Sequence, residues 1–186
     1  AQLGDGSEIS RAAPAVVSGV GTDNKALAAG DYQGMLLKNS AAGYVWGRIT
    51  DALSYWEPTA LTQIGVASAI KGIAAGDGYD LALLTSGEVY AFGSLQSGVV
   101  PNLLNPVAMT AGAQSYFPPM FLKSDGTVWK MSLNGQGGLE DCVQATELSS
   151  VKLLDAYDIG YYVQTDDTLL VQTSPQTASF SRGGIL

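Results

Sequence analysis

Acidic side chains occur in three close pairs along the sequence, and these pairs are the residues with which the chain could do chemistry. Two carboxylates can serve as acid and base in glycoside hydrolysis, or bind calcium through their oxygen atoms. The last two pairs fall at a predicted strand end and in a predicted hairpin turn, which indicates a structural role. The pairs are Glu140/Asp141, Asp155/Asp158 and Asp166/Asp167.

The composition lacks the residues that nucleophilic catalysis and structural zinc sites usually need. The chain has no histidine and a single cysteine, Cys142. Glu140 and Asp141 precede this cysteine, and their negative charges raise a thiol pKa and so reduce its reactivity. We therefore predict an unreactive Cys142, a protein that is not an enzyme, no metal site and no cofactor.

The charge balance opposes binding to nucleic acid. The 186 residues include 9 Lys plus Arg and 17 Asp plus Glu, for a formal net charge of −8. Phosphate backbones are repelled by such a chain. The stretch 90–122 has no charged residue, but prolines interrupt it well short of the ~20 apolar residues that a membrane helix needs. We expect neither nucleic acid partners nor membrane insertion.

The compartment is indicated only by composition. The chain opens on AQLGDGSEIS, without the basic start and apolar run of a signal peptide, so we expect any targeting signal outside this chain. Gly, Ser, Thr and Tyr are abundant and Lys is scarce. This composition favours an extracellular, cell-surface or virion protein.

Aromatic side chains recur where strands are predicted to end, and two pairs stand beside proline in SYWEP and SYFPP. Clustered Tyr and Trp are typical anchors of protein recognition surfaces. The alternative is that these rings cover the ends of the strand units; Trp46, Phe92 and Trp129 are predicted to be core. The candidate partner-binding residues are Tyr32, Tyr55, Trp56, Tyr79, Tyr116, Phe117 and Tyr157.

An internal repeat organises the chain. Residues 26–47 align with residues 72–93 after a shift of 46, and weaker copies occupy 110–132 and 155–173. A period of this length is typical of solenoids, propellers and arrays. We predict one repeat domain, 1–186, with repeats at about 1–47, 48–93, 94–132 and 133–173 and a tail at 174–186.

Each copy has the pattern of strands. A small-residue segment ending in Gly precedes a short apolar run, a two-residue turn such as Ser86-Gly87, and a second run rich in Val, Tyr, Trp or Phe. Such a unit cannot bury its faces alone, so neighbouring units must stack. We predict an all-β fold of propeller blades, each with three to four antiparallel strands. Ala28-Ala29-Gly30 and Ala74-Ala75-Gly76 are expected in the innermost strands, where blades crowd.

The same residues resemble the repeat of the regulator of chromosome condensation family, of the bacterial or viral type rather than the chromatin-bound exchange factor. The family pattern has A-A-G, L-A-L, a Gly turn, V-Y-x-W-G, then G-Q-L-G-x-G and Pro-x-x-Val. The family repeat often has a histidine at one position, and this chain has Gln33, Tyr79 and Ile159 at the corresponding positions. The matching segments are Ala74-Ala75-Gly76, Leu81-Ala82-Leu83, Gly87, Val89–Gly93 and Ala1–Gly6 with Pro14 and Val17.

The resemblance implies seven blades, whereas this chain holds about four copies. Head and tail could close a small ring, the chain could be part of a longer propeller, or partner chains could complete it; we favour the last two. The family includes a Ran exchange factor, a β-lactamase inhibitor and adaptor domains, which implies a non-enzymatic protein-interaction module acting through aromatic loops. The alternatives are a structural subunit of a surface appendage, fibre or virion, completed by neighbouring chains or further copies of itself, and, third, a glycan hydrolase.

Overall fold

The structure is a computed structural model of the 186-residue chain. It describes residues 3–4, 9–17, 19–47, 59–77, 79–93, 97–113, 118–133, 138–156, 160–172 and 180–183. Regular structure in these ranges consists of β-strands, as the sequence predicts. Across the same ranges, no helix is long and apolar enough to cross a lipid bilayer.

The strands form four antiparallel sheets of four strands each, which we number as blades 1 to 4. Blade 1 contains β1 (Asn24–Ala29), β2 (Gln33–Lys38), β3 (Gly43–Gly47) and β4 (Thr59–Gln63). Blade 2 contains β5 (Ile70–Ala75), β6 (Tyr79–Leu84), β7 (Val89–Gly93) and β8 (Gly98–Val99). Blade 3 contains β9 (Ala108–Thr110), β10 (Met120–Leu122), β11 (Val128–Leu133) and β12 (Leu139–Gln144). Blade 4 contains β13 (Val151–Ala156), β14 (Gly160–Gln164), β15 (Leu169–Gln172) and β16 (Phe180–Gly183).

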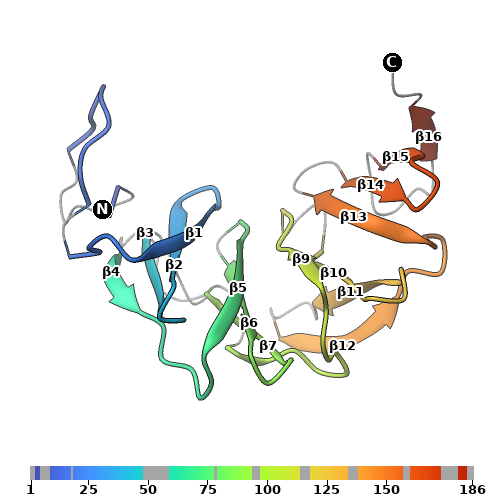
Figure 1. Ribbon diagram of the computed structural model, residues 1–186, viewed down its shortest axis with the longest axis horizontal. Coiled ribbons are helices and arrows are strands. Elements are labelled where there is room, and N and C mark those ends of the chain that lie inside the picture. Colours follow the sequence, from blue (N-terminus) through green and yellow to red (C-terminus); the bar gives the residue numbers. More distant parts are fainter. Residues whose placement is uncertain are drawn as a thin grey trace.

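The blades follow one another along an open arc (Figure 1). Within each blade the strands pair in chain order, and the first strands meet across blades: β1 contacts β5, β5 contacts β9, and β9 contacts β13. These first strands are therefore the inner strands of a propeller segment. The all-β propeller architecture predicted from the repeat is confirmed, with four blades along the arc.

The predicted repeats and the observed blades differ in phase. The predicted boundaries after residues 47, 93, 132 and 173 fall at or near the end of the third strand of each sheet. The fourth strand of one blade thus lies in the next predicted repeat. The first three strands of each copy share a pattern in sequence, whereas the fourth strands, such as β4 and β12, share none.

The second and third strands of each blade are joined by a tight turn of constant geometry. One residue of each turn has positive φ: Ala41 at 65°, Gly87 at 94°, Gly126 at 81° and Asp167 at 66°. The amide of that residue donates to the carbonyl of the residue three positions earlier, with N···O distances of 3.0 Å in all four turns. The hairpin turn predicted from Ser-Gly, Asp-Gly and Asp-Asp is confirmed.

The inner strands crowd as the alanine-rich pattern predicts. A Cβ placed on Gly30 would lie 2.0 Å from the carbonyl oxygen of Gly76, and a Cβ on Gly76 would lie 2.7 Å from that of Gly112. Both contacts are to backbone of the following blade, which a side chain cannot displace. Glycine at the end of the inner strand therefore permits the close packing of consecutive blades.

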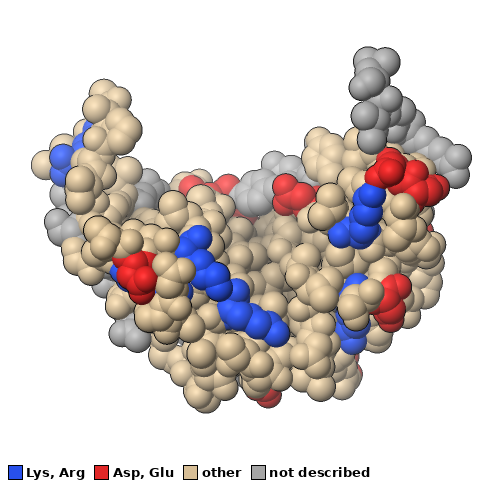
Figure 2. All heavy atoms as spheres, viewed as in Figure 1, with Lys and Arg blue, Asp and Glu red and all other residues tan. Residues whose placement is uncertain are grey.

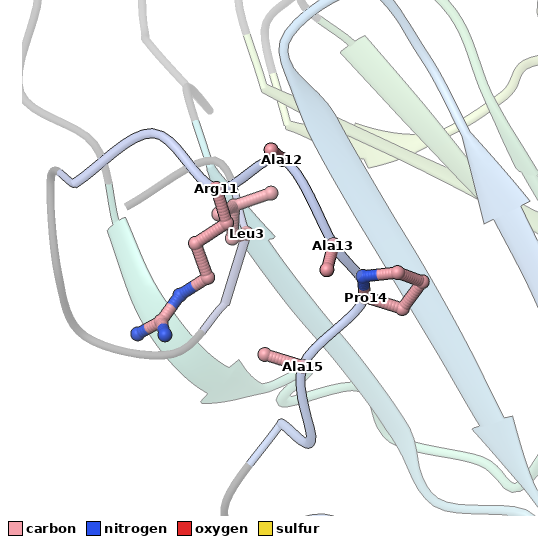
Figure 3. A pocket seen from close by; sticks show the side chains of 6 residues that line it. All are labelled: Leu3, Arg11, Ala12, Ala13, Pro14 and Ala15. Carbon is pink, nitrogen blue, oxygen red and sulfur yellow. The ribbon is translucent and has the colours of Figure 1, made fainter.

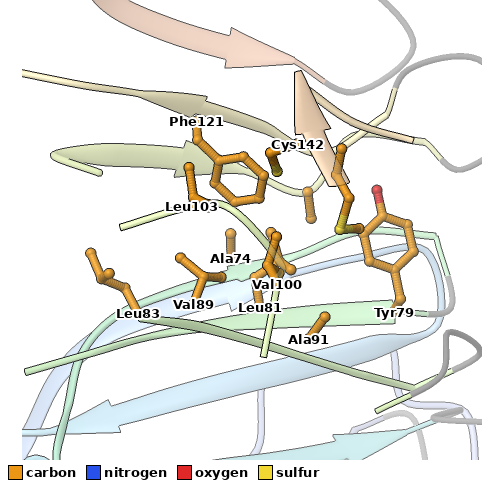
Figure 4. Packing of buried hydrophobic residues seen from close by; sticks show 12 residues of the cluster. Ala74, Tyr79, Leu81, Leu83, Val89, Ala91, Val100, Leu103, Phe121 and Cys142 are labelled. Carbon is orange, nitrogen blue, oxygen red and sulfur yellow. The ribbon is translucent and has the colours of Figure 1, made fainter. Parts of the chain in front are cut away.

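Apolar side chains fill the spaces between blades. Between blades 2 and 3 the cluster joins Leu81 and Val89 to Phe121 and Met131, all fully buried (Figure 4). A second cluster joins blade 3 to blade 4, and a third joins Leu37 of blade 1 to blade 2. The aromatics predicted as core also pack within the blades but keep part of their surface exposed: Trp46, Phe92 and Trp129.

Candidate interaction surface

The first and third strands of blade 1 end on the same side of the sheet. In blade 1, Gly34 pairs with Ala29, Gln33 pairs with Gly47, and Gly47 pairs with Thr59. The chain therefore leaves β1 and β3 on the same side of the sheet, where these strands end. We call this side, formed by strand ends and their connections, the Gly30 edge. The tight β2–β3 turns lie at the opposite edge.

The third strand ends at this edge in a glycine with a special backbone. Gly47 has φ of 92° and Gly93 has φ of 110°, values that favour glycine. A Cβ on Gly47 would lie 2.3 Å from the carbonyl oxygen of Tyr32. The final Gly of the repeated V-W-G and A-F-G segments thus sets the exit of the chain into its next connection.

Side chains at the Gly30 edge tie each blade to the following one. Gln33 Nε2 donates to the carbonyl oxygen of Gly76 at 2.7 Å, and Tyr79 Oη donates to that of Gly112 at 3.3 Å. Gln33 and Tyr79 occupy equivalent positions, the ones that hold histidine in the family repeat. Both donate to the glycine that follows the next inner strand, so each supplies a hydrogen bond between consecutive blades.

Blades 3 and 4 are tied by a different residue. Pro118 occupies the equivalent position in blade 3 and has no side-chain donor. Thr110 donates instead from the inner strand itself, with its Oγ1 2.6 Å from the carbonyl oxygen of Ala156. Each of the three blade interfaces therefore has a buried hydrogen bond from a side chain to an inner-strand carbonyl.

Tyr79 is a core residue rather than a surface anchor. Its ring is 0% exposed within the cluster between blades 2 and 3. Burial raises its pKa well above the usual value, and the charges of Asp77 and Asp80 raise the pKa further. The sequence alternative, in which such a ring covers the end of a blade core, is the correct one for Tyr79.

Tyr32 keeps an exposed ring at the Gly30 edge. It lies in the connection between β1 and β2, is 42% exposed, and its backbone amide donates to Gln33 Oε1 at 3.2 Å. Its position is therefore compatible with binding a partner. The remaining candidates lie outside the described residues: Tyr55, Trp56, Tyr116, Phe117 and Tyr157.

The acidic pair Asp166/Asp167 belongs to a turn. Asp166 Oδ1 accepts from the amide of Thr168 at 3.0 Å, and Asp167 has the positive φ of the turn. Asp125 has the same role in blade 3, where its Oδ1 accepts from the amide of Thr127 at 2.9 Å. A hydrogen bond from the Thr127 hydroxyl lowers the pKa of Asp125, and the bond from the Thr127 amide lowers it further. These carboxylates stabilise hairpin turns.

Cys142 is shielded in the blade core. It is 4% exposed, and burial raises the pKa of its thiol to about 12. Lys123 lowers this pKa and Asp141 raises it, both less than burial does. An unreactive thiol is therefore expected, as the sequence predicts, although burial outweighs the neighbouring charges on which that prediction rested.

Asp80 is a functional candidate that the sequence did not single out. Its side chain is 0% exposed on β6, and neither carboxylate oxygen has a hydrogen-bond partner. Burial raises its pKa to about 7, and the nearby Gln33 side chain lowers the pKa by less. The sequence did contain an indication of this site. The positions equivalent to Asp80 in the other repeats hold uncharged residues, namely Gly34, Pro119 and Gly160.

The described surface has hollows but no cluster of metal-binding side chains. Within the described ranges, no group of three or more His, Cys, Asp or Glu side chains could hold a metal ion. A hollow of about 370 Å³ lies against the N-terminal segment (Figure 3). Its lining combines small apolar side chains with one charged residue: Leu3, Arg11, Ala12, Ala13, Pro14 and Ala15.

Charges of both signs occur on the face seen in Figure 2, so the acidic composition does not produce a uniformly negative surface there. Lys152 pairs with Asp167, and Lys130 Nζ lies 3.3 Å from Glu147 Oε1. Such exposed pairs contribute little to stability. They do place positive charge beside negative charge on blades 3 and 4.

Comparison with solved structures identifies similar folds. Human WBSCR16 superposes with a TM-score of 0.66 and 11% identity over 89% of this chain. Yeast RCC1 (Prp20), solved with Kap60 bound, gives 0.65 and 15% over 88%. Prp20p from Saccharomyces cerevisiae, characterised for binding to Gsp1p and histones, gives 0.67 and 16% over 88%. These RCC1-like propellers support the resemblance of the repeats, and at these identities the likeness shows the fold.

The chain spans about half the length of these structures, from 49% of yeast RCC1 to 56% of human WBSCR16. No family model matches the sequence. No curated protein matches it either.

Proposed function

We propose that the chain is a non-enzymatic protein-interaction module whose partner binds at the Gly30 edge. The observation that carries this proposal is the strand register. It brings the connections after the first and third strands to one edge, where Tyr32 is 42% exposed. Tyr55, Trp56, Tyr116, Phe117 and Tyr157 belong to connections of these two kinds. Clustered aromatic rings on such connections suit recognition of a protein surface.

The chemistry of the described residues supports binding rather than catalysis. Cys142 is buried with a raised pKa, and Asp125 and Asp166 are engaged in turns. Prp20 was solved in complex with Kap60, which supports a propeller of this kind as a protein-binding scaffold. We extend this role, without the partner's identity, to the present chain.

The test is quantitative affinity capture from extracts of the source organism, with the purified chain as bait. Tyr55 and Trp56 are replaced together by alanine, and Tyr32 separately by alanine. We expect about a tenfold or greater loss of the same captured protein, with an unchanged melting temperature. Val143→Ala is the matched control because Val143 is 46% exposed on β12, a strand in blade 3. Equal capture by all variants would reject the aromatic edge as the binding surface.

A second candidate is a structural subunit whose ring is completed by neighbouring chains. A specific observation favours it: Leu153 and Tyr161 share a face of blade 4 and are 61% and 45% exposed. We propose an extracellular, cell-surface or virion location for either role. Fractionation of cells and culture medium with an antibody to the chain tests that location, and a purely cytosolic signal would contradict it.

A further inference from the structure

A hollow of about 510 Å³ lies between the first strands of blades 2 and 3. Both blades have a neighbouring blade on each side, and the hollow lies at the starts of β5 and β9, away from the Gly30 edge. Its volume falls within the range of about 300–1,000 Å³ that is typical of ligand sites with apolar walls. The lining is largely apolar with one charged residue, and includes Lys71, Ile73, Leu83, Pro106, Val107 and Met109.

Gly72 leaves this hollow open. A Cβ placed on Gly72 would lie 3.5 Å from Leu83 Cβ and 3.8 Å from Met109 Cε, which are ordinary contact distances. Neither a backbone clash, as at Gly30, nor a positive φ therefore requires glycine at this position. What glycine provides is the space itself. The positions with the same strand register in the other blades all hold side chains, namely Ala26, Ala108 and Leu153.

Lys71 owes its position to a β-bulge. The pairing of β5 with β6 shifts between Ile70 and Gly72, so Lys71 is the extra residue of the bulge, a feature that redirects a side chain. It is exposed and lines the hollow. Equivalent shifts in blades 1 and 4 place Lys25 and Lys152 at the bulge. Three of the four inner strands thus begin with a lysine that stands outside the regular pairing.

The charge of Lys71 is available to a ligand. Lys152 pairs with Asp167, and the hollow of about 340 Å³ beside Lys152 is also lined by the carboxylate of Asp125. Among the residues that the structure describes, neither Lys25 nor Lys71 forms an ion pair. Figure 2 shows a band of Lys and Arg side chains over the first strands of blades 1 and 2. This region is therefore positive in a chain whose net charge is −8.

The backbone beside the hollow suits an extended peptide. Strands β5 and β9 are each the first strand of a sheet and pair on one side only, with β6 and β10. The other side of each strand carries backbone N–H and C=O groups that the sheet does not use. Gly72 exposes its backbone to the hollow because it has no side chain. A free strand edge beside a side-chain pocket is how many domains bind extended peptides.

We propose that the hollow between β5 and β9 binds an extended segment of a partner protein in which an acidic residue stands next to a large apolar residue. The apolar side chain packs against Leu83 and Met109, and the carboxylate pairs with the ammonium group of Lys71. Backbone groups of the segment bond to the free strand edge. This site lies at the opposite ends of the inner strands from the Gly30 edge, so it goes beyond the function proposed above.

The test is the binding of a short fluorescent peptide that alternates glutamate and leucine, measured by fluorescence anisotropy with the purified full chain. The control peptide has glutamine in place of each glutamate. We expect the glutamate peptide to bind about tenfold or more tightly than the control, because a charged acceptor strengthens the bond to an ammonium group. Added salt should weaken the binding of the glutamate peptide and have little effect on the control.

Variants of the lining locate the peptide. Lys71→Gln should weaken binding about tenfold, and Lys71→Arg should retain most of it. Gly72→Leu fills the hollow and should also weaken binding about tenfold or more, whereas Gly72→Ala should cause a smaller loss. Lys152→Gln is the matched control, because Lys152 holds the equivalent bulge position but pairs with Asp167. Circular dichroism checks the fold of each variant, and Lys71→Gln decides the outcome if Gly72→Leu does not fold.

Three results would overturn the proposal: no binding of the glutamate peptide, equal binding of the glutamine peptide, or equal affinity of Lys71→Gln and the wild type. Competition by octanoate as strong as that by unlabelled peptide would also overturn it, because the hollow would then take a free carboxylate rather than a peptide. Tyr32→Ala, at the Gly30 edge, should leave peptide binding unchanged. The peptide site and the Gly30 edge can therefore fail independently.

Discussion

Gln33 Nε2 donates to the carbonyl oxygen of Gly76 at 2.7 Å, across the interface between blades 1 and 2. The same nitrogen lies 3.4 Å from the carbonyl oxygen of Tyr79. Gln33 is 4% exposed, so water cannot replace it as the donor. The bond fixes the second strand of one blade against the inner-strand end of the next, where the two backbones are closest.

Removing this donor should destabilise the arc. Gln33→Leu keeps a side chain of similar volume but leaves the buried carbonyl of Gly76 without its partner, which costs about 1–3 kcal/mol of unfolding free energy. Gln33→His restores the residue found in the family repeat and keeps an N–H donor. We expect it to retain most of the stability. Urea denaturation followed by circular dichroism measures both, and equal losses for the two variants would argue against the hydrogen bond.

A methyl group at the inner-strand end should be poorly tolerated. Gly30→Ala places a Cβ 2.0 Å from the carbonyl oxygen of Gly76, so the two blades must separate. We expect a loss of about 1–3 kcal/mol, the usual cost of overpacking. Gly65→Ala is the control, because no atom lies within 4 Å of a Cβ there. It should be neutral or slightly stabilising, and a comparable loss at both sites would contradict the close-packing explanation.

The contrast between Tyr32 and Tyr79 shows where sequence reasoning reaches its limit. Both follow the inner-strand glycine of their repeat, Tyr32 by two positions and Tyr79 by three. Side chains alternate between faces along a strand, so a difference of one position changes the side chain's surroundings completely. The 46-residue repeat did predict the first three strands of each blade, the turns and the crowded inner strands. Exposure depended on the neighbouring blade, which local sequence does not encode.

The positions of the fourth strands and the burial of Asp80 were not predicted, for related reasons. Strand β4 pairs with β3 through Gly47 and Thr59, but no shared pattern marks the fourth strands of the blades. Asp80 is fully buried near Gln33 of blade 1, and a sequence shows a carboxylate in an apolar run without showing which residues pack against it. The positions of the fourth strands and the burial of Asp80 depend on contacts that the repeated sequence pattern does not contain.

The two tyrosines should respond oppositely to truncation. Tyr79→Ala opens a cavity in the cluster with Leu81 and Phe121, and we expect a loss of about 3–5 kcal/mol. Tyr79→Phe removes only the bond to Gly112 and should cost about 0.5–1.5 kcal/mol. Tyr32→Ala should change stability by less than about 0.5 kcal/mol, since 42% of the residue is exposed. Chemical denaturation of the three variants separates core from surface, and a Tyr32→Ala loss as large as that of Tyr79→Ala would place Tyr32 in the core.

Asp80 should make the protein less stable as the pH rises. Its pKa is about 7 in the folded chain against the ordinary aspartate value of 3.8, so between these values the folded state holds a proton that the unfolded state has released. Folding stability falls with increasing pH wherever the folded state binds more protons. The contribution is thus fully favourable below pH 3.8 and is lost as the pH rises to about 7, a change on the order of 4 kcal/mol.

Asp80→Asn separates this group from the other carboxylates. The amide has nearly the same shape and no charge, so the variant should be more stable than the wild type at pH 8 and should lose the decline between pH 4 and about 7. Asp77→Asn is the matched control, a carboxylate three residues earlier in the loop after β5. Urea denaturation at a series of pH values provides the measurement. A decline that survives Asp80→Asn unchanged would assign the pH dependence to another group and would mean that the buried carboxylate finds a partner when it ionises.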